Sequence, residues 1–331
     1  MKKPIYIFNN GELKRKDNSL YFIKSEEEKK NIPVNAVSEI HIFGELDINK
    51  RTLEFLTSQK IPIYFYNHYG YYIGCFYPRE YYNSGIIILK QAECFLDEKE
   101  RLKLAKSFVD GAIQNILKNL KYYKKTKEEL VEPYINTIET KYLNIESIQD
   151  IPTLMALEGD IRKIYYEAFN VILDNNDFFF DKRTKRPPDN PINALISFGN
   201  TLLYTTILSQ IYRTHLDPRI GYLHETNQRS FSLNLDIAEV FKPIIVDRII
   251  FSLINKNQIQ KKHFEESIEY TYLNEKGKQI FIDAFESKLS TTINYKHLGK
   301  ISYRKLLRIE CYKLYKHFLK ERSYEPYISN W

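Results

Sequence analysis

The hydrophobic pattern of the chain changes at about residue 80, and this change constrains the fold more than any other feature. Before it, short β-branched or aromatic runs are separated by turn residues, as is typical of strands. A single stretch, residues 50–60, has the apolar spacing of a short helix. We therefore predict a small β-rich N-terminal domain over residues 1–80. Its expected strands are 5–8, 19–23, 37–43, 61–66 and 71–76.

Beyond about residue 90 the apolar residues recur at helical spacing, as Phe108, Ile113 and Ile116 do. Because Pro and Gly residues gather between 77 and 85, we expect a linker over 81–90 and a larger all-α domain over 91–331. The predicted fold class is therefore α+β. Further helices are expected at 153–174, 190–213, 232–254 and 301–321, with loops at 184–191 and 216–230.

The composition favours a polyanionic partner, because the formal net charge is +7. The 27 Tyr and 20 Phe residues suit stacking against bases as well as packing in a core. The three cysteines lack CxxC spacing, which excludes an obvious disulfide framework or zinc ribbon. No apolar run reaches the roughly 18 residues of a membrane span, and the first residues do not form a secretory signal. We expect a cytoplasmic protein.

Glu158 is a carboxylate on an otherwise apolar helix stripe. The helix should begin near Pro152, and Leu154, Ile161 and Tyr165 recur along the stripe. An ionised carboxylate that faces a core needs a cationic partner or a metal. On this segment alone, a buried ion pair and a metal site remain equally open.

A second group of carboxylates, Asp236 and Glu239, stands three residues apart and therefore on one side of a helix. Two adjacent carboxylates repel each other unless a cation lies between them. Pro243 has no N–H to donate to the carbonyl of Glu239, so the helix should kink there. Pairing with Arg229 or Arg248 is the structural alternative to a metal.

His224 lies in the loop that follows the Asp217-Pro218 turn. Imidazole is the commonest nitrogen ligand of transition metals, and it is compatible with Mn²⁺ beside carboxylates. Spacing alone does not select this residue among the seven histidines. The chain has no HExxH motif or cysteine cluster that would support a zinc site.

Four segments in order carry a family resemblance: MALEGDIRKIYYEAF, PPDNPINALISFGNTLLY, LDPRIGYLHE and RSFSLNLDIAEVFKPIIVDR. With the earlier runs IYIFNNGELKRKDNSLYF and VSEIHIFGELDINKRTLEFL, they resemble CRISPR-associated protein one, the integrase of spacer acquisition. The resemblance is greatest to the branch found with type I-B systems. It covers nearly the whole chain and implies a β-rich N-terminal dimerisation domain before an α-helical catalytic domain.

The resemblance also implies a set of metal ligands. The glutamate of the family's Glu-Gly motif falls on Glu158, its histidine after the Asp-Pro turn on His224, and its last acidic ligand on Glu239. Asp236 matches the neighbouring acidic position, and whether Asp236 or Glu239 touches the metal directly is left open. The metal would be Mg²⁺ or Mn²⁺. Asn193 and Ser197 match a motif that borders the family's site, and Tyr165 matches an aromatic residue of its Glu-Gly helix.

The activity that the resemblance implies is transesterification, in which the 3′-hydroxyl of a short DNA fragment attacks a phosphodiester at the end of a CRISPR repeat. The implied partners are double-stranded DNA, a second copy of the chain and CRISPR-associated protein two. Two other classes remain open. One is a metal-dependent nuclease or transposase-like enzyme that serves no CRISPR array, and the other is a non-catalytic DNA scaffold.

Basic residues that could hold DNA gather in the Pro-rich loop and in the last helix. In that helix, Leu307, Cys311 and Leu314 share one face, so its basic side chains are displayed elsewhere. For any single lysine, an ordinary solvated surface is the alternative. The expected DNA-binding residues are Lys182, Arg183, Lys185, Arg186, Arg229, Arg248, Arg304, Lys305, Arg308 and Lys316.

Overall fold

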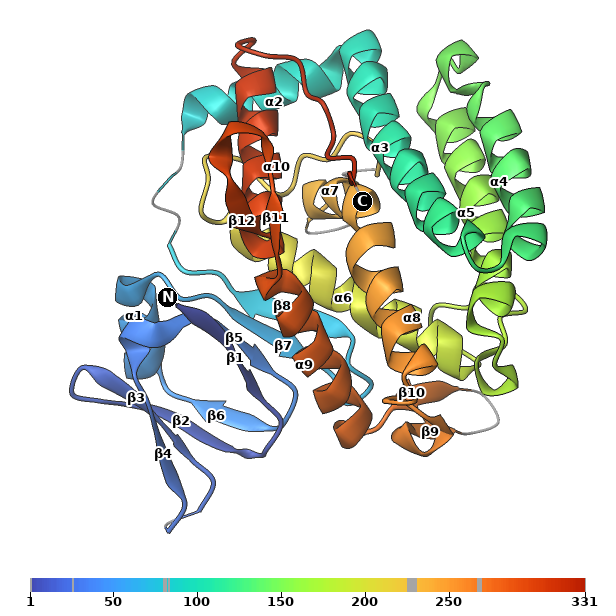
Figure 1. Cartoon of the computed structure of the whole chain (residues 1–331). Coiled ribbons are helices and arrows are strands. Elements are labelled where there is room, and N and C mark those ends of the chain that lie inside the picture. Colours follow the sequence, from blue (N-terminus) through green and yellow to red (C-terminus); the bar gives the residue numbers. More distant parts are fainter. Residues whose placement is uncertain are drawn as a thin grey trace. The chain divides into compact units, whose positions relative to one another are not determined.

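The computed structural model describes residues 2–25, 27–79, 82, 84–224, 231–266 and 270–330. The chain forms two compact units, Met1–Tyr82 and Asn83–Trp331 (Figure 1). Helix α2 begins at Gly85, so residues 85–90 are not part of a linker as we expected. The glycine that we interpreted as a boundary signal is instead the first residue of a helix whose next residues are apolar.

The first unit contains two four-stranded sheets. In one, β1, β5 and β7 are parallel, and β8 is antiparallel to β7. In the other, β2 pairs antiparallel to β3 and parallel to β6, and β4 lies at the edge. The bounds are β1 (Lys3–Ile7), β2 (Gly11–Lys16), β3 (Ser19–Ile23), β4 (Lys29–Ile32), β5 (Val37–Ile42), β6 (Leu46–Ile48), β7 (Ile63–Tyr66), β8 (Tyr72–Phe76) and helix α1 (Lys50–Gln59).

The expected strands and the single helix of this unit are all present, but β2, β4 and β6 were not predicted. The reason is composition: in GELKRK only Leu13 is buried, and in KKNI only Ile32 is. Strands with so few inward apolar residues give no alternating signal. Leu13 and Leu20 nevertheless pack with Leu56 of α1 in one core.

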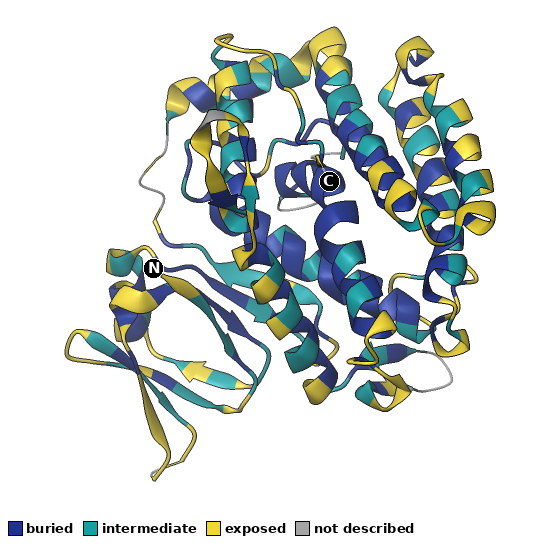
Figure 2. Cartoon of the chain, viewed as in Figure 1, coloured by how far each residue is buried: buried dark blue, intermediate teal, exposed yellow. Residues whose placement is uncertain are grey.

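The second unit is mainly helical. Helices α3, α4 and α5 run side by side, and Figure 2 shows their buried faces turned inward. Helix α6 is buried nearly all round, with 17 of its 21 residues buried, so it is the central helix. The bounds are α2 (Gly85–Leu96), α3 (Glu98–Lys124), α4 (Glu128–Tyr142), α5 (Ile151–Leu173), α6 (Pro191–Ile211), α7 (Leu233–Phe241), α8 (Arg248–Asn255), α9 (Glu275–Ser290) and α10 (Tyr303–Phe318).

Two short hairpins interrupt the helices and correct the expectation of an all-α domain. They are β9 (Phe264–Glu266) with β10 (Thr271–Leu273), and β11 (Thr292–Asn294) with β12 (Lys300–Ser302). Each strand has only three residues, too few for an alternating pattern to be recognised. None of the helices within the described ranges has the length and apolarity required to span a bilayer.

The break expected at Pro243 is present, and it takes the form of a π-helix, η4 (Pro243–Asp247). The N–H of Asp247 donates to the carbonyl of Lys242, five residues earlier, at 3.1 Å. A π-turn accommodates one extra residue, and one residue corresponds to about 100° of rotation in an α-helix. The side chains after η4 therefore point in directions that a continuous helix over 232–254 would not predict.

A segment near the C-terminus, residues 324–329, packs back onto α3 and α7. The Asn115 amide donates to the carbonyls of Val240 and Tyr327 at 2.8 Å each, and it accepts the Ser329 N–H at 2.9 Å. The Tyr327 ring stacks on Phe241 with the two planes nearly parallel. One buried amide thus ties this segment, which we call the strap, to the helix that carries Asp236 and Glu239.

Candidate active site

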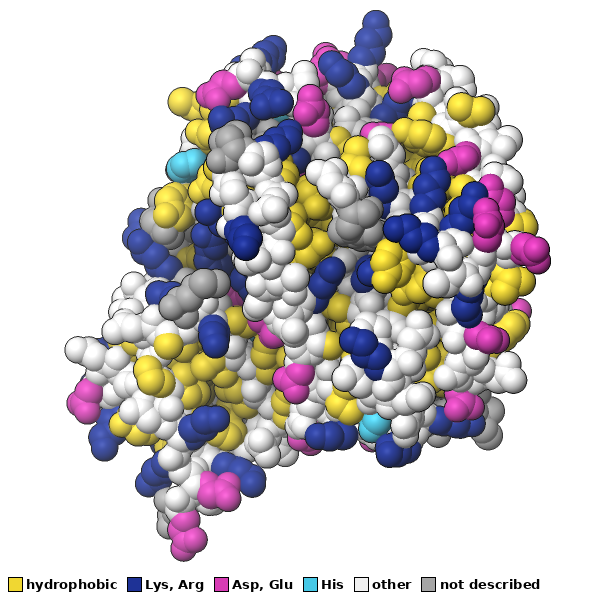
Figure 3. Space-filling view, in the orientation of Figure 1, with side chains coloured by type: hydrophobic (Ala, Val, Ile, Leu, Met, Phe, Trp, Pro, Cys, Tyr) yellow, Lys and Arg dark blue, Asp and Glu magenta, His cyan; other side chains and the backbone are white. Residues whose placement is uncertain are grey.

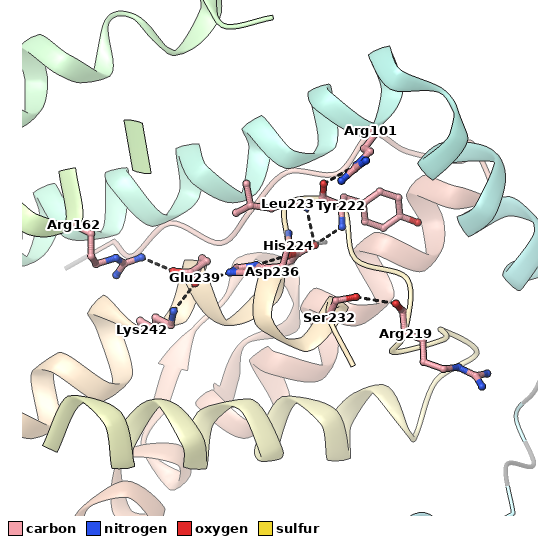
Figure 4. Close-up of polar contacts among 10 residues, drawn as sticks. All are labelled: Arg101, Arg162, Arg219, Tyr222, Leu223, His224, Ser232, Asp236, Glu239 and Lys242. Carbon is pink, nitrogen blue, oxygen red and sulfur yellow. Dashed lines mark hydrogen bonds and ion pairs between the residues drawn. The ribbon is translucent and has the colours of Figure 1, made fainter. Parts of the chain in front are cut away.

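Asp236 binds the loop before α7 to that helix. Its side chain is fully buried and accepts the backbone N–H groups of Tyr222 at 2.6 Å, Leu223 at 3.1 Å and His224 at 3.0 Å. It also contacts Nδ1 of His224 at 2.8 Å (Figure 4). A carboxylate accepts, so Nδ1 carries the proton, and the imidazole presents Nε2 to Glu239 at 3.8 Å.

Glu239 lies between two buried cations. Arg162 Nη2 donates to its Oε2 at 2.5 Å, and Lys242 pairs with its Oε1. The same guanidinium donates to Glu158 at 2.9 Å, so Arg162 bridges Glu158 on α5 and Glu239 on α7. The three ligands that the resemblance implied, Glu158, His224 and Glu239, therefore converge from separate segments.

The pKa values of these groups follow from their charged neighbours. Burial alone would raise the pKa of Glu239, but Lys242, Arg162 and His224 outweigh burial and lower it to about 2. Burial would likewise lower the pKa of His224, but the hydrogen bond and charge of Asp236 raise it above its usual range. Both shifts favour the charged forms, so the site is an ionised network.

Glu158, Glu239 and His224 are residue types that bind divalent cations. In this structure, Arg162 and Lys242 neutralise the two glutamates. Within the described part of the chain, no three or more His, Cys, Asp or Glu side chains gather closely enough to hold a metal. Two carboxylates and an imidazole whose Nδ1 is fixed by Asp236 nevertheless match the ligands and the outer support of metal sites. A cation would have to replace Arg162 between Glu158 and Glu239.

The expected supporting residues form hydrogen bonds with residues outside the ion pairs of this network. The Tyr165 hydroxyl accepts a hydrogen bond from Asn119 at 2.7 Å and is fully buried. Asn193 and Ser197 both accept from Arg183, at 3.1 and 2.9 Å. Asn193 and Ser197 thus hold the Pro-rich loop against α6, which makes them structural supports of that loop.

Three charged residues of the site were not predicted from the sequence. Arg162 follows Glu158 by four residues and Lys242 follows Glu239 by three, spacings at which ion pairs form on helices. This spacing could therefore have predicted the cationic partners of the two glutamates. We had instead considered Arg229 and Arg248 as partners of the acidic pair. Asp247 is the third. No sequence pattern indicates that it belongs to the site, because the direction of its side chain depends on the π-turn.

The expected DNA-binding residues differ in their accessibility. Arg229 lies outside the described residues. Arg248 stacks over the Tyr122 ring at 4.1 Å, Arg304 pairs with Glu286 at 2.7 Å, and Arg308 donates to Gln210 at 2.9 Å. These three serve internal contacts. The exposed residues of the set are Lys182, Lys185, Arg186, Lys305 and Lys316.

Lys185 is exposed but close to the candidate site. Burial of part of its side chain and the cations Arg183 and Lys242 lower its pKa, while Glu158 and Glu239 act in the opposite direction. On the face drawn in Figure 3, described Lys and Arg side chains are dispersed and mixed with Asp and Glu. Charge alone therefore does not define a DNA path on that face.

Comparisons with known proteins assign the family. The family model described as CRISPR associated protein Cas1 matches residues 5–287. A "CRISPR-associated endonuclease Cas1 2" of Thermodesulfovibrio yellowstonii is 56% identical over 100% of both chains. The solved Cas1 structure from Thermotoga maritima has 46% identity and a TM-score of 0.89, and the match covers 97% of this chain and 99% of that one.

Two more distant structures share the fold. One, described as a casposase bound to integration product, has 19% identity and a TM-score of 0.83, covering 98% and 92% of the two chains. The other belongs to a Cas6-RT-Cas1–Cas2 complex, with 18% identity and a TM-score of 0.83, and this chain corresponds to 36% of its length. Assignment to the type I-B branch stays a prediction. The family model and the relative that matches end to end show that this chain belongs to the Cas1 family of CRISPR-associated endonucleases.

Proposed function

We propose that this chain is a CRISPR adaptation integrase that joins the 3′-hydroxyl ends of short DNA fragments to the repeat of a CRISPR array. The observation that carries the proposal is the convergence of Glu158, Glu239 and His224 on one network, in which Glu239 is buried and Glu158 and His224 are partly buried. A DNA-binding scaffold has no need for such costly buried charges. The similarity to a casposase bound to integration product supports the same direction, although at that identity it concerns the fold alone.

Glu158, Glu239 and His224 are the residues that would hold Mg²⁺ or Mn²⁺ in this proposal. Such a cation, when bound, polarises the scissile phosphate and favours attack by an oxygen nucleophile. Asp236 holds the proton of His224 on Nδ1 and keeps Nε2 directed at Glu239. The proposal therefore takes Asp236 as the orienting carboxylate and Glu239 as the direct ligand.

The test of the catalytic site is strand transfer of a labelled duplex into a plasmid that contains a repeat, in Mn²⁺, Mg²⁺ or EDTA. Glu158→Ala should abolish joining but retain DNA binding and fold, because the Glu158 side chain is 22% exposed and Arg162 keeps Glu239 as its partner. Asp160→Ala is the matched control, since Asp160 is an exposed carboxylate on the same helix, paired with Lys141. Joining that persists in EDTA or in Glu158→Ala would contradict the proposal.

The same experiment separates integration from cleavage. If water replaces the 3′-hydroxyl, the site would hydrolyse the phosphodiester. Hydrolysis is the reaction of an endonuclease, and the 56% identical relative is named as one. A joined product carries the label in the plasmid, whereas cleavage only shortens or linearises the DNA. Exclusive cleavage would favour the nuclease alternative.

DNA binding should depend on exposed lysines of α10. Lys305 and Lys316 are exposed, whereas Arg304 and Arg308 make internal contacts. Reversing the charge of the two lysines should make affinity less salt-dependent, by about one unit of the log–log slope per lysine. Lys118→Glu, at an exposed position of α3, is the control. An unchanged slope in the double variant would show that α10 is only a solvated surface.

The proposed assembly is a homodimer that also binds CRISPR-associated protein two. Integration at two repeat ends requires two active sites, and a two-fold axis would supply them. One distant structural neighbour belongs to a complex that contains a Cas2, which is consistent with the second partner. Light scattering that shows a strict monomer at micromolar concentration would contradict the dimer.

A further inference from the structure

Asp247 is a buried carboxyl group at the end of the π-helix. Its residue is 1% exposed, and neither carboxylate oxygen has a partner among the described residues. Burial raises the pKa of Asp247 to about 7, against the opposing effects of the Arg162 charge and of the Tyr165 hydroxyl, whose approach to Asp247 falls outside normal hydrogen-bond geometry. An unsatisfied buried carboxyl is costly to keep, so its position calls for a function.

A second buried group without a partner belongs to Arg162. Nη1 of Arg162 is buried and also has no hydrogen-bond partner among the described residues. Burial has the largest effect on the pKa of Asp247, and the charge of Arg162 has the second largest. The charge of Asp247 in turn contributes to the raised pKa of Arg162. One guanidinium therefore binds Glu158 and Glu239, and its charge also acts on the pKa of Asp247, to which it makes no ion pair among the described residues.

The π-helix turns Asp247 toward the side of the helix that carries Glu239, the partner of Arg162. Asp247 follows Glu239 by eight residues, which in a continuous α-helix is about 80° away from the same face. The extra residue of η4 removes most of that offset and brings Asp247 back toward the side of Glu239. π-turns inside helices recur at functional sites.

The charges of the network balance only while no metal is bound. Arg162 and Lys242 carry two positive charges against the two negative charges of Glu158 and Glu239. A divalent cation held by the two glutamates would use those negative charges and leave the protein cations without them. A buried guanidinium in that position needs another acceptor.

We propose that Arg162 is an exchangeable counter-ion and that Asp247 is the positioning residue that receives its guanidinium when a divalent cation takes Glu158 and Glu239. This inference rests on the proposed metal-dependent function. It assigns Arg162 two positions: between the ligands without metal, and against Asp247 with metal. Asp247 thereby sets the affinity for the cation without touching it.

The experiment measures the dissociation constant of Mn²⁺ by electron paramagnetic resonance of the free ion, with each protein first stripped by EDTA. Asp247→Asn should weaken Mn²⁺ binding by about 10- to 100-fold, the usual effect of losing an outer partner. In Arg162→Gln, where no guanidinium needs the acceptor, adding Asp247→Asn should change the constant by less than about threefold. Glu310→Gln, another fully buried carboxylate, is the matched control and should bind Mn²⁺ as wild type does.

The outcomes separate three ideas. Equal weakening by Asp247→Asn in both backgrounds, or none in either, overturns the exchange. Wild-type protein that binds no Mn²⁺ overturns the proposed metal site itself. If Asp247→Asn unfolds at a lower temperature than the wild type in EDTA, the variant cannot test the exchange. The nuclear magnetic resonance signal of the Arg162 Nε–H in the wild type is then the test. On Mg²⁺ addition this signal should shift yet stay protected from solvent exchange, whereas rapid exchange would show a guanidinium released to water and overturn the exchange.

Discussion

Replacing Asp236 should both destabilise the protein and weaken metal binding, because this one side chain holds the loop and orients the imidazole. Three backbone N–H groups and Nδ1 of His224 share its carboxylate. Each buried N–H left without an acceptor costs about 1–3 kcal/mol, so Asp236→Ala should lose at least about 3 kcal/mol of unfolding free energy. Urea unfolding followed by circular dichroism measures this loss.

The matched control is Asp217→Ala, which removes a smaller cap from the same loop. Asp217 accepts one backbone N–H, that of Arg219 at 2.9 Å, together with the Arg219 side chain. Because Asp217→Ala leaves one backbone N–H without an acceptor instead of three, it should lower the unfolding free energy by about 1 kcal/mol. Because Asp217 does not touch His224, Mn²⁺ affinity should be unchanged in the control and about 10- to 100-fold weaker in Asp236→Ala. Equal stability of the two variants, or equal Mn²⁺ affinity, would refute the reasoning.

Four further changes test the network and the strap. Glu239→Ala should cost about 3–5 kcal/mol, because Arg162 and Lys242 are left buried without their shared carboxylate; adding Lys242→Met should recover part of the loss in urea unfolding. The lowered pKa of Glu239 contributes stability that is present above its ordinary pKa of about 4.5 and lost as pH falls toward 2, so Glu239→Gln should flatten the acid limb of the stability profile. The raised pKa of His224 acts in the opposite sense: its contribution is complete below about pH 6.5 and lost as pH rises, a slope that His224→Gln should remove. Asn115→Ala should destabilise by about 2–4 kcal/mol and remove the hydrogen-exchange protection of the Ser329 amide, because the strap loses its bond to α3; a protected Ser329 would contradict that role.

Sequence patterns predicted the elements that have strong periodicity. The stripe of Leu154, Ile161 and Tyr165 is fully buried, as expected for the inner face of α5. The spacing of the apolar residues also predicted that Leu307 and Cys311 share one face of α10, and both are buried. The charged strands β2 and β4 had no such pattern, because each buries only one residue.

The candidate site was predictable as a set of residues, but its electrostatics were not. The resemblance named Glu158, His224 and Glu239, and the structure brings them together. Helix spacing could have identified Arg162 and Lys242 as the cations that neutralise the glutamates. We had considered Arg248, which stacks on Tyr122 instead, and Arg229, which lies outside the described residues. Asp247 could not be found from sequence, because one extra residue in η4 changes the direction of its side chain.

The strap is synthesised after the two helices that its backbone ties together. Asn115 and Val240 leave the ribosome long before Tyr327 and Ser329, so α7 meets α3 while one amide still lacks two of its partners. The nascent helical unit must then keep that amide hydrated until residues 324–329 arrive and displace the water. Asn115 therefore gains its last two partners only after every ligand of the proposed metal site has been made.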